Sequence, residues 1–156
     1  MWLTKAHTSQ EAPTSISGSS SHDEDKDLAF THGQLGCCHR NLENYEEALD
    51  SFKKAYDLND DSWYLYSIGR CLRGLERHEE AIKVLLESRQ ISLAEEDVVD
   101  GEDFELAYCY IGIGDKENAQ KYLDLARDSV TQRGILNDCL KEKIEEIEKG
   151  ILSLEN

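Results

Sequence analysis

The chain has 156 residues, of which 32% are charged and 39% hydrophobic, and its formal net charge is −16 at pH 7. A surface of this charge repels phosphate backbones and anionic lipids, which argues against nucleic acid or a membrane surface as the main partner. No run approaches the roughly 18 apolar residues that a membrane-spanning helix needs. The single proline favours an all-helical chain with short connections, because proline interrupts helices.

Residues 1–22 form a first segment that ends in a stretch dominated by Ser, Thr, Gly and Pro. Such a composition buries too little apolar surface to offset the entropy of folding, so the segment is predicted to be a flexible Ser-rich tail or linker. It lacks the apolar stretch of a secretory signal, and the five cysteines are odd in number. We therefore expect a reduced, cytoplasmic protein. A short match of residues 3–13 to the end of a repeat leaves open that the chain is part of a longer array.

From residue 23 onward the pattern is helical, and one stretch of eleven residues nearly recurs three times. The copies are LENYEEALDSF at 42–52, LERHEEAIKVL at 75–85 and IGDKENAQKYL at 113–123. Self-similarity at a period of about 20 to 50 residues indicates a solenoid, in which each unit completes its core against its neighbours. The distance between the second and the third copy is longer than that between the first and the second. The extra residues fall in an acidic loop, SLAEEDVVDGED.

Each unit is predicted to be a hairpin of two antiparallel helices. Small residues recur in pairs where the two helices must approach closely, at 36/48, 69/81 and 107/119. First helices are expected at about 24–41, 61–74 and 102–113, and second helices at about 44–58, 77–92 and 116–131. A final helix at about 135–153 presents one apolar stripe, Leu140, Ile144, Ile147 and Ile151, as a capping helix would.

This pattern resembles the tetratricopeptide repeat (TPR). The matching residues are Leu35, Gly36, Tyr45, Ala48, Phe52 and Ala55 in the first unit, Ile68, Gly69, Leu72, Ala81, Ile82 and Leu85 in the second, and Leu106, Ala107, Tyr110, Ala119, Leu123 and Ala126 in the third. The resemblance implies an all-α α-solenoid of three antiparallel helix hairpins with a carboxyl-terminal capping helix. The expected division is three repeats within 23–131, at about 29–61, 62–99 and 100–131, followed by the cap at 132–156.

The resemblance also implies a concave groove that is lined by the first helices and binds peptides. Its candidate residues here are Phe30, Cys37, Arg40, Asn41, Trp63, Tyr66, Arg70, Arg73, Phe104, Tyr108 and Ile111, with glycines at the remaining positions. This set is rich in Arg and aromatic residues, which are enriched at binding hot spots, and it contains no acid. We expect a protein or peptide partner with acidic and apolar side chains. The alternative is that the aromatics pack between units and the arginines pair with nearby acids of the chain itself.

One TPR subfamily binds the carboxyl-terminal carboxylates of chaperone tails through basic and amide side chains. The corresponding positions here are Gly33, Cys37, Ser67, Gly101 and Glu105, and none matches. A co-chaperone of that type is therefore not expected.

The stretch HGQLGCCH at 32–39 places two His and two Cys close together, and both are zinc ligands. Neighbouring helical positions diverge in direction, however, and Cys38, Cys71 and Cys109 occupy equivalent positions in the three units. We therefore predict that these cysteines fill the interior and that the chain holds no metal. No catalytic or phosphate-binding motif is present, so we expect neither an enzyme nor a cofactor.

The predicted function is that of a non-catalytic scaffold or adaptor for protein interaction. The alternative is a small acidic TPR chaperone, since the size, charge and repeat layout are also similar to chaperones of type III secretion translocators. The sequence leaves the partner and the oligomeric state open.

Overall fold

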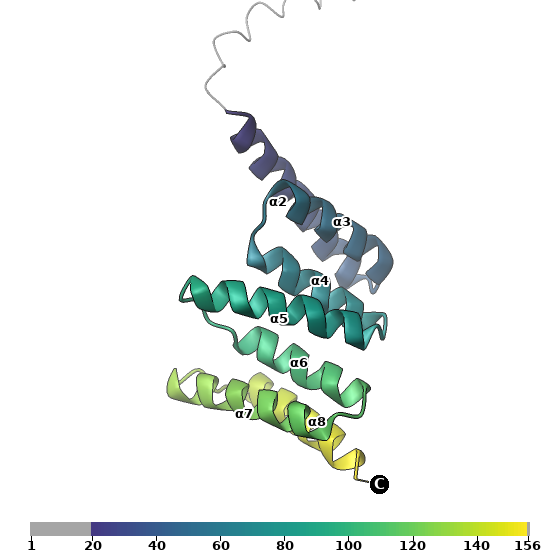
Figure 1. The fold of residues 1–156 in the computed structure, drawn as a ribbon, viewed down its shortest axis with the longest axis vertical. Coiled ribbons are helices and arrows are strands. Elements are labelled where there is room, and N and C mark those ends of the chain that lie inside the picture. Colours follow the sequence, from purple (N-terminus) through teal and green to yellow (C-terminus); the bar gives the residue numbers. More distant parts are fainter. Residues whose placement is uncertain (1–19, 156) are drawn as a thin grey trace, which may run out of the picture.

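The computed structural model describes residues 20–155, which form seven helices and no strand. They are α2 (Ser21–Asn41), α3 (Tyr45–Leu58), α4 (Ser62–Gly74), α5 (His78–Ala94), α6 (Asp100–Gly112), α7 (Lys116–Gln132) and α8 (Asp138–Ser153). The pairs α2–α3, α4–α5 and α6–α7 are hairpins that stack in chain order, and α8 closes the row (Figure 1). The predicted all-α solenoid of three hairpins with a carboxyl-terminal helix is confirmed.

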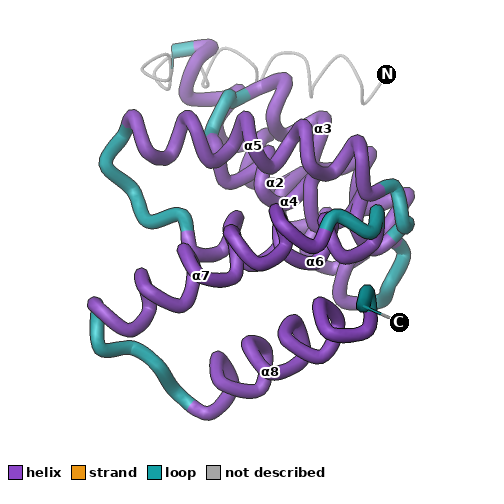
Figure 2. The backbone as a smooth tube through the Cα atoms, turned by 60° about the horizontal axis from the view of Figure 1, so that its bottom comes forward, coloured by secondary structure: helices purple, strands orange, loops and turns teal. Residues whose placement is uncertain are grey.

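Each helix packs on the next one along the chain, and the first helices α4 and α6 also contact each other. The last helix, α8, packs against both α7 and α6 at the end of the stack (Figure 2). This placement matters for function, because α6 is one of the helices predicted to line the groove. None of the helices in residues 20–155 is long and apolar enough to cross a membrane.

Small residues allow the two helices of a hairpin to approach closely. A Cβ atom on Gly36 would lie 2.8 Å from the ring of Phe52, and one on Gly69 would lie 2.5 Å from Leu85. Real Cβ atoms do not come this close, so each glycine is matched to a large side chain of its own hairpin. The ring of Phe52 also meets Trp63 of the next hairpin edge-on, at 5.9 Å between centroids. Phe52 therefore joins two units as well as filling one.

The apolar stripe of the last helix is buried against the repeats as predicted. Ile144, Ile147 and Ile151 are buried, and Leu140 is partly buried and packs on the same core. The spacing of these residues places them on one face of α8, which is why the rest of the helix can remain charged and exposed.

Two expectations for the amino-terminal side need correction. The tail predicted for residues 1–22 lies mostly outside the described residues, but α2 already begins at Ser21, with Asp23 and Glu24 in its acidic first turn. Cys38 is exposed, whereas Cys71 and Cys109 are fully buried as predicted. The physical reason is position in the stack: no described hairpin precedes α2, so this face of the first unit has no neighbour to cover it.

Candidate functional site

Three cavities lie in a row along the first helices. The first, of about 300 Å³, lies between Phe30 on α2 and Trp63 on α4. The second, of about 410 Å³, lies between α4 and the start of α6 and is walled by Trp63 and Tyr66. The third, of about 390 Å³, is bounded by α4, α6 and α8 and includes Arg70 and Tyr108. Together these cavities make a groove, and we use that word for them below.

The predicted groove residues differ in exposure. Phe30 and Trp63 are 61% and 44% exposed, so both present apolar surface at the first cavity. Phe104, by contrast, is only 2% exposed and belongs to the core, so it offers no surface to a ligand. Asn41 is exposed, and the remaining predicted residues are partly buried: Cys37, Arg40, Tyr66, Arg70, Arg73, Tyr108 and Ile111.

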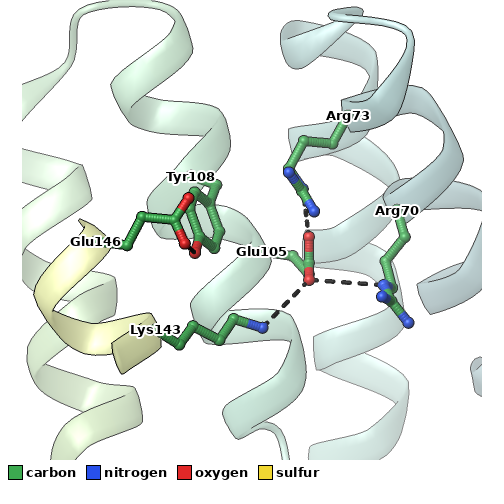
Figure 3. A network of polar contacts seen from close by, with 6 residues as sticks. All are labelled: Arg70, Arg73, Glu105, Tyr108, Lys143 and Glu146. Carbon is green, nitrogen blue, oxygen red and sulfur yellow. Dashed lines mark hydrogen bonds and ion pairs between the residues drawn. The ribbon is translucent and has the colours of Figure 1, made fainter. Parts of the chain in front are cut away.

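A buried carboxylate organises the third cavity. Glu105 on α6 is 1% exposed, and three cations surround it (Figure 3). Arg73 Nε donates to Glu105 Oε2 at 2.5 Å, while Arg70 Nε and Lys143 Nζ lie 3.6 and 3.5 Å from Oε1. Burial opposes the charge of Arg73, but the charge of Glu105 and the hydrogen bond raise the pKa of Arg73 overall.

This cluster adds acids to the predicted set of groove residues, which itself contains none. Glu105 lines the third cavity, and Glu142 and Glu146 reach it from α8. The pairing of arginines with nearby acids, which the sequence left as an alternative, therefore holds for Arg73 and in part for Arg70. Glu105 stands at one of the positions where a TPR subfamily carries a basic or amide side chain, but the repeat pattern could not reveal that cations from α4 and α8 would surround it.

Arg40 and Arg70 keep more of their hydrogen-bonding capacity than Arg73. Arg40 forms no ion pair with any residue between 20 and 155, and its guanidinium lies 5.8 Å from the centroid of the Phe52 ring. Arg70 Nε is buried and has no hydrogen-bond partner there, since Glu105 is too far for one. Arg70 lines the third cavity, whereas Arg40 lines none of the three cavities and is placed beside the groove by the repeat pattern.

Helix α8 narrows the groove at the third unit. Tyr108 Oη donates to Glu146 Oε2 at 2.9 Å, and burial with this hydrogen bond raises the pKa of Tyr108 well above its usual range. A Cβ atom on Gly150 would lie 2.9 Å from Ile111 Cδ1, so α8 also approaches the far end of α6 closely. Two predicted groove residues, Tyr108 and Ile111, thus hold the terminal helix in place.

A second buried carboxylate lies in the second, middle cavity of the groove. Glu102 on α6 is 7% exposed and lines the second cavity, whose rim carries Asp61 and Asp97. Ser88 and Ser92 donate their hydroxyls to Glu102 Oε1 at 3.0 and 3.3 Å. These acids were not among the predicted groove residues either, because they lie at the helix starts and in the acidic loop.

No group of three potential metal-ligating side chains comes together in residues 20–155. Within that range, the cluster of charges around the groove is thus built from ion pairs and hydrogen bonds between side chains.

Stacked hairpins with a groove along their first helices define a helical-repeat protein. Tetratricopeptide repeat models match residues 29–62, 64–92 and 104–126, which together span more than half of the chain. The chain belongs to the tetratricopeptide repeat family, a non-catalytic fold for protein interaction.

A solved structure, the TPR2AB-domain:pHSP90-complex of yeast Sti1, is similar to the chain with a TM-score of 0.67 and 18% sequence identity. The similarity covers 83% of this chain and 49% of that one, so the present chain spans about half the length of that structure. At this identity the likeness shows the fold alone. No match is found among curated proteins.

Proposed function

We propose that the chain binds a peptide or protein segment in its groove and acts as a non-catalytic scaffold or adaptor. The observation that carries the proposal is the row of three cavities along the first helices, with exposed aromatic side chains beside the first and cations beside the third. Aromatic residues and arginines supply much of the binding energy at protein interfaces.

The two ends of this row favour different side chains of a partner. Phe30 and Trp63 present apolar surface that a partner's apolar side chain would bury. Arg40 and Arg70 have guanidinium donors that no carboxylate of the described chain fully occupies, and guanidinium binds carboxylate through paired hydrogen bonds. We therefore propose a partner segment with acidic and apolar side chains.

The experiment is a selection of binders from a random-peptide library, followed by affinity measurement with the variant Arg40→Glu. Arg40 is preferable to Arg70 and Arg73. A glutamate in place of either of these two arginines would lie beside the buried Glu105 and break its ion pairs. The matched control is Lys83→Glu, an exposed position on the second helix α5.

We expect acidic and apolar peptides to be enriched and to bind Arg40→Glu at least about tenfold more weakly, which corresponds to about 1.4 kcal/mol. Binding to Lys83→Glu should match the wild type. Selected peptides that bind Arg40→Glu as well as the wild type would contradict a groove site.

The chaperone alternative, of the type III secretion translocator class, is favoured by one feature of α2. Leu28 and Leu35 of α2, and Leu42 directly after its end, are exposed at intervals of seven residues, which aligns them as an apolar stripe along one face. A chaperone needs exposed apolar surface to hold an unfolded segment. Suppression of the aggregation of an unfolded client would support this alternative, and a scaffold would show no such effect.

A further inference from the structure

The second cavity of the groove combines aromatic walls with an acidic floor. Trp63 and Tyr66 of α4 form the walls, while Ser62, Ser92 and Glu102 form the floor between α4, α5 and α6. No lysine or arginine lines this cavity. It differs in this from the third cavity, where three cations accompany the acids.

Glu102 is a buried carboxylate without a counter-ion. Its Oε1 accepts hydrogen bonds from two serine hydroxyls, which are neutral, and its Oε2 forms no hydrogen bond or ion pair with the residues between 20 and 155. The other two buried acids of α6 are matched by cations, Asp103 by Arg89 at 2.6 Å and Glu105 by Arg73. An acid that lines an open cavity and that no lysine or arginine of this cavity pairs with is suited to bind a cation from outside.

Aromatic surface beside this carboxylate suits the same kind of ligand. Trp63 remains 44% exposed at the cavity, and an aromatic face attracts a cation placed over it. Gly101 permits the close approach of Tyr66, since a Cβ atom there would lie 3.2 Å from Tyr66 Oη. At the rim, Asp61 accepts a hydrogen bond from the Trp63 backbone N–H at 2.8 Å, which holds its negative charge beside the indole.

We propose that this cavity receives an arginine or lysine side chain of the polypeptide bound in the groove, with Glu102 as its counter-ion. The inference rests on the proposed function and makes it more specific. A bound polypeptide would then have one preferred orientation. Its basic side chain would bind near the amino-terminal ends of α4 and α6, and its acidic side chain near Arg40 and Arg70.

The test uses two small probes of the same shape, Nα-acetyl-arginine amide and its uncharged analogue Nα-acetyl-citrulline amide. The chain has two tryptophans, so a Trp2→Phe background leaves Trp63 as the fluorescent reporter at the cavity. We expect the arginine probe to change Trp63 fluorescence saturably and to bind at least about tenfold more tightly than the citrulline probe. Equal binding of the two probes, or no saturable binding of either, would overturn the inference.

The variant Glu102→Gln assigns the effect to this residue. Glutamine keeps the size of the side chain and can still accept hydrogen bonds from Ser88 and Ser92, but it removes the charge. Binding of the arginine probe should weaken about tenfold, while Glu145→Gln, the same change at an exposed position on α8, should leave it unchanged. Unchanged affinity in a folded Glu102→Gln variant would also overturn the inference, and circular dichroism establishes folding.

The two proposals fail in different ways. If the arginine probe does not bind but selected peptides still depend on Arg40, the basic-residue pocket is excluded and the peptide groove stands. If no peptide depends on Arg40, the proposed function fails whatever the small probe does.

Discussion

At the residue scale, the turns inside the three hairpins place one residue each in the left-handed backbone region. These residues are Glu43, Glu76 and Gly114, with φ of 60°, 59° and 76°. In the second turn the Arg77 N–H bonds to the Leu72 carbonyl at 2.9 Å, which closes the helix end in the same way as in the other two. Only the third unit has glycine at this position, so the first two turns carry backbone strain.

Replacing Glu76 by glycine should stabilise the protein by about 0.5–1 kcal/mol, because glycine adopts this conformation without a steric penalty. The reverse change, Gly114→Ala, should destabilise it by about 1 kcal/mol through the backbone alone, since no atom lies within 4 Å of the added Cβ. The urea midpoint measures both effects. A lower midpoint for Glu76→Gly would show that the glutamate side chain contributes more than its backbone strain costs.

At the element scale, α8 combines an apolar face with polar contacts to the groove. Ile147 is fully buried, while Lys143 reaches Glu105 and Glu146 accepts from Tyr108. The apolar face supplies most of the docking energy, because partly exposed ion pairs contribute little.

Ile147→Ala should therefore destabilise the chain by about 2–5 kcal/mol, as for other buried isoleucines. Ile135→Ala, at a position that is 42% exposed before α8, is the matched control and should change stability by less than about 0.5 kcal/mol. Urea unfolding gives the free energies, and hydrogen exchange shows whether α8 opens before the repeats. Equal effects of the two substitutions would mean that α8 is not held by its apolar face.

At the scale of the whole molecule, the cysteines at equivalent positions of the second and third units are part of one continuous core. Burial raises the pKa of Cys71 to about 11 and that of Cys109 to about 12, from an ordinary value of 9.0. Because the folded-state pKa values are raised, the stability that these thiols contribute is fully present below pH 9.0. It is lost as the pH rises through about 11 and 12.

We expect the free energy of unfolding to fall by on the order of 1–3 kcal/mol between about pH 9 and pH 11. The double variant Cys71→Ala, Cys109→Ala should lose a smaller amount over the same range, because no buried thiol remains at these sites to titrate. Urea unfolding at several pH values checks this. An equal loss in the double variant would assign the effect to other groups, such as Tyr66, whose pKa burial raises to about 12.

Much of this architecture was predictable from the sequence, because it depends on local pattern and repetition. Glycine and alanine at 36/48, 69/81 and 107/119 predicted the close helix pairs, and the stripe on the last helix predicted its buried face. The same pattern predicted Trp63, Tyr66 and the arginines as first-helix residues beside a groove. A repeat determines these positions because each unit places equivalent residues in equivalent surroundings.

The tertiary structure alone decided which groove residues are exposed to solvent and which charged side chains form ion pairs. The angle at which α8 packs on α6 brought Lys143 and Glu146 to Glu105 and Tyr108, and stacking of α6 on α4 and α5 buried Glu102 beneath two serines. Cys38 is exposed because its unit lies at the end of the described stack, whereas the equivalent Cys71 and Cys109 are buried. These outcomes depend on contacts between residues far apart in the chain, and such contacts leave no periodic signal in the sequence. The sequence thus determined the repeat and the face of each helix, while packing between units decided the electrostatics of the groove.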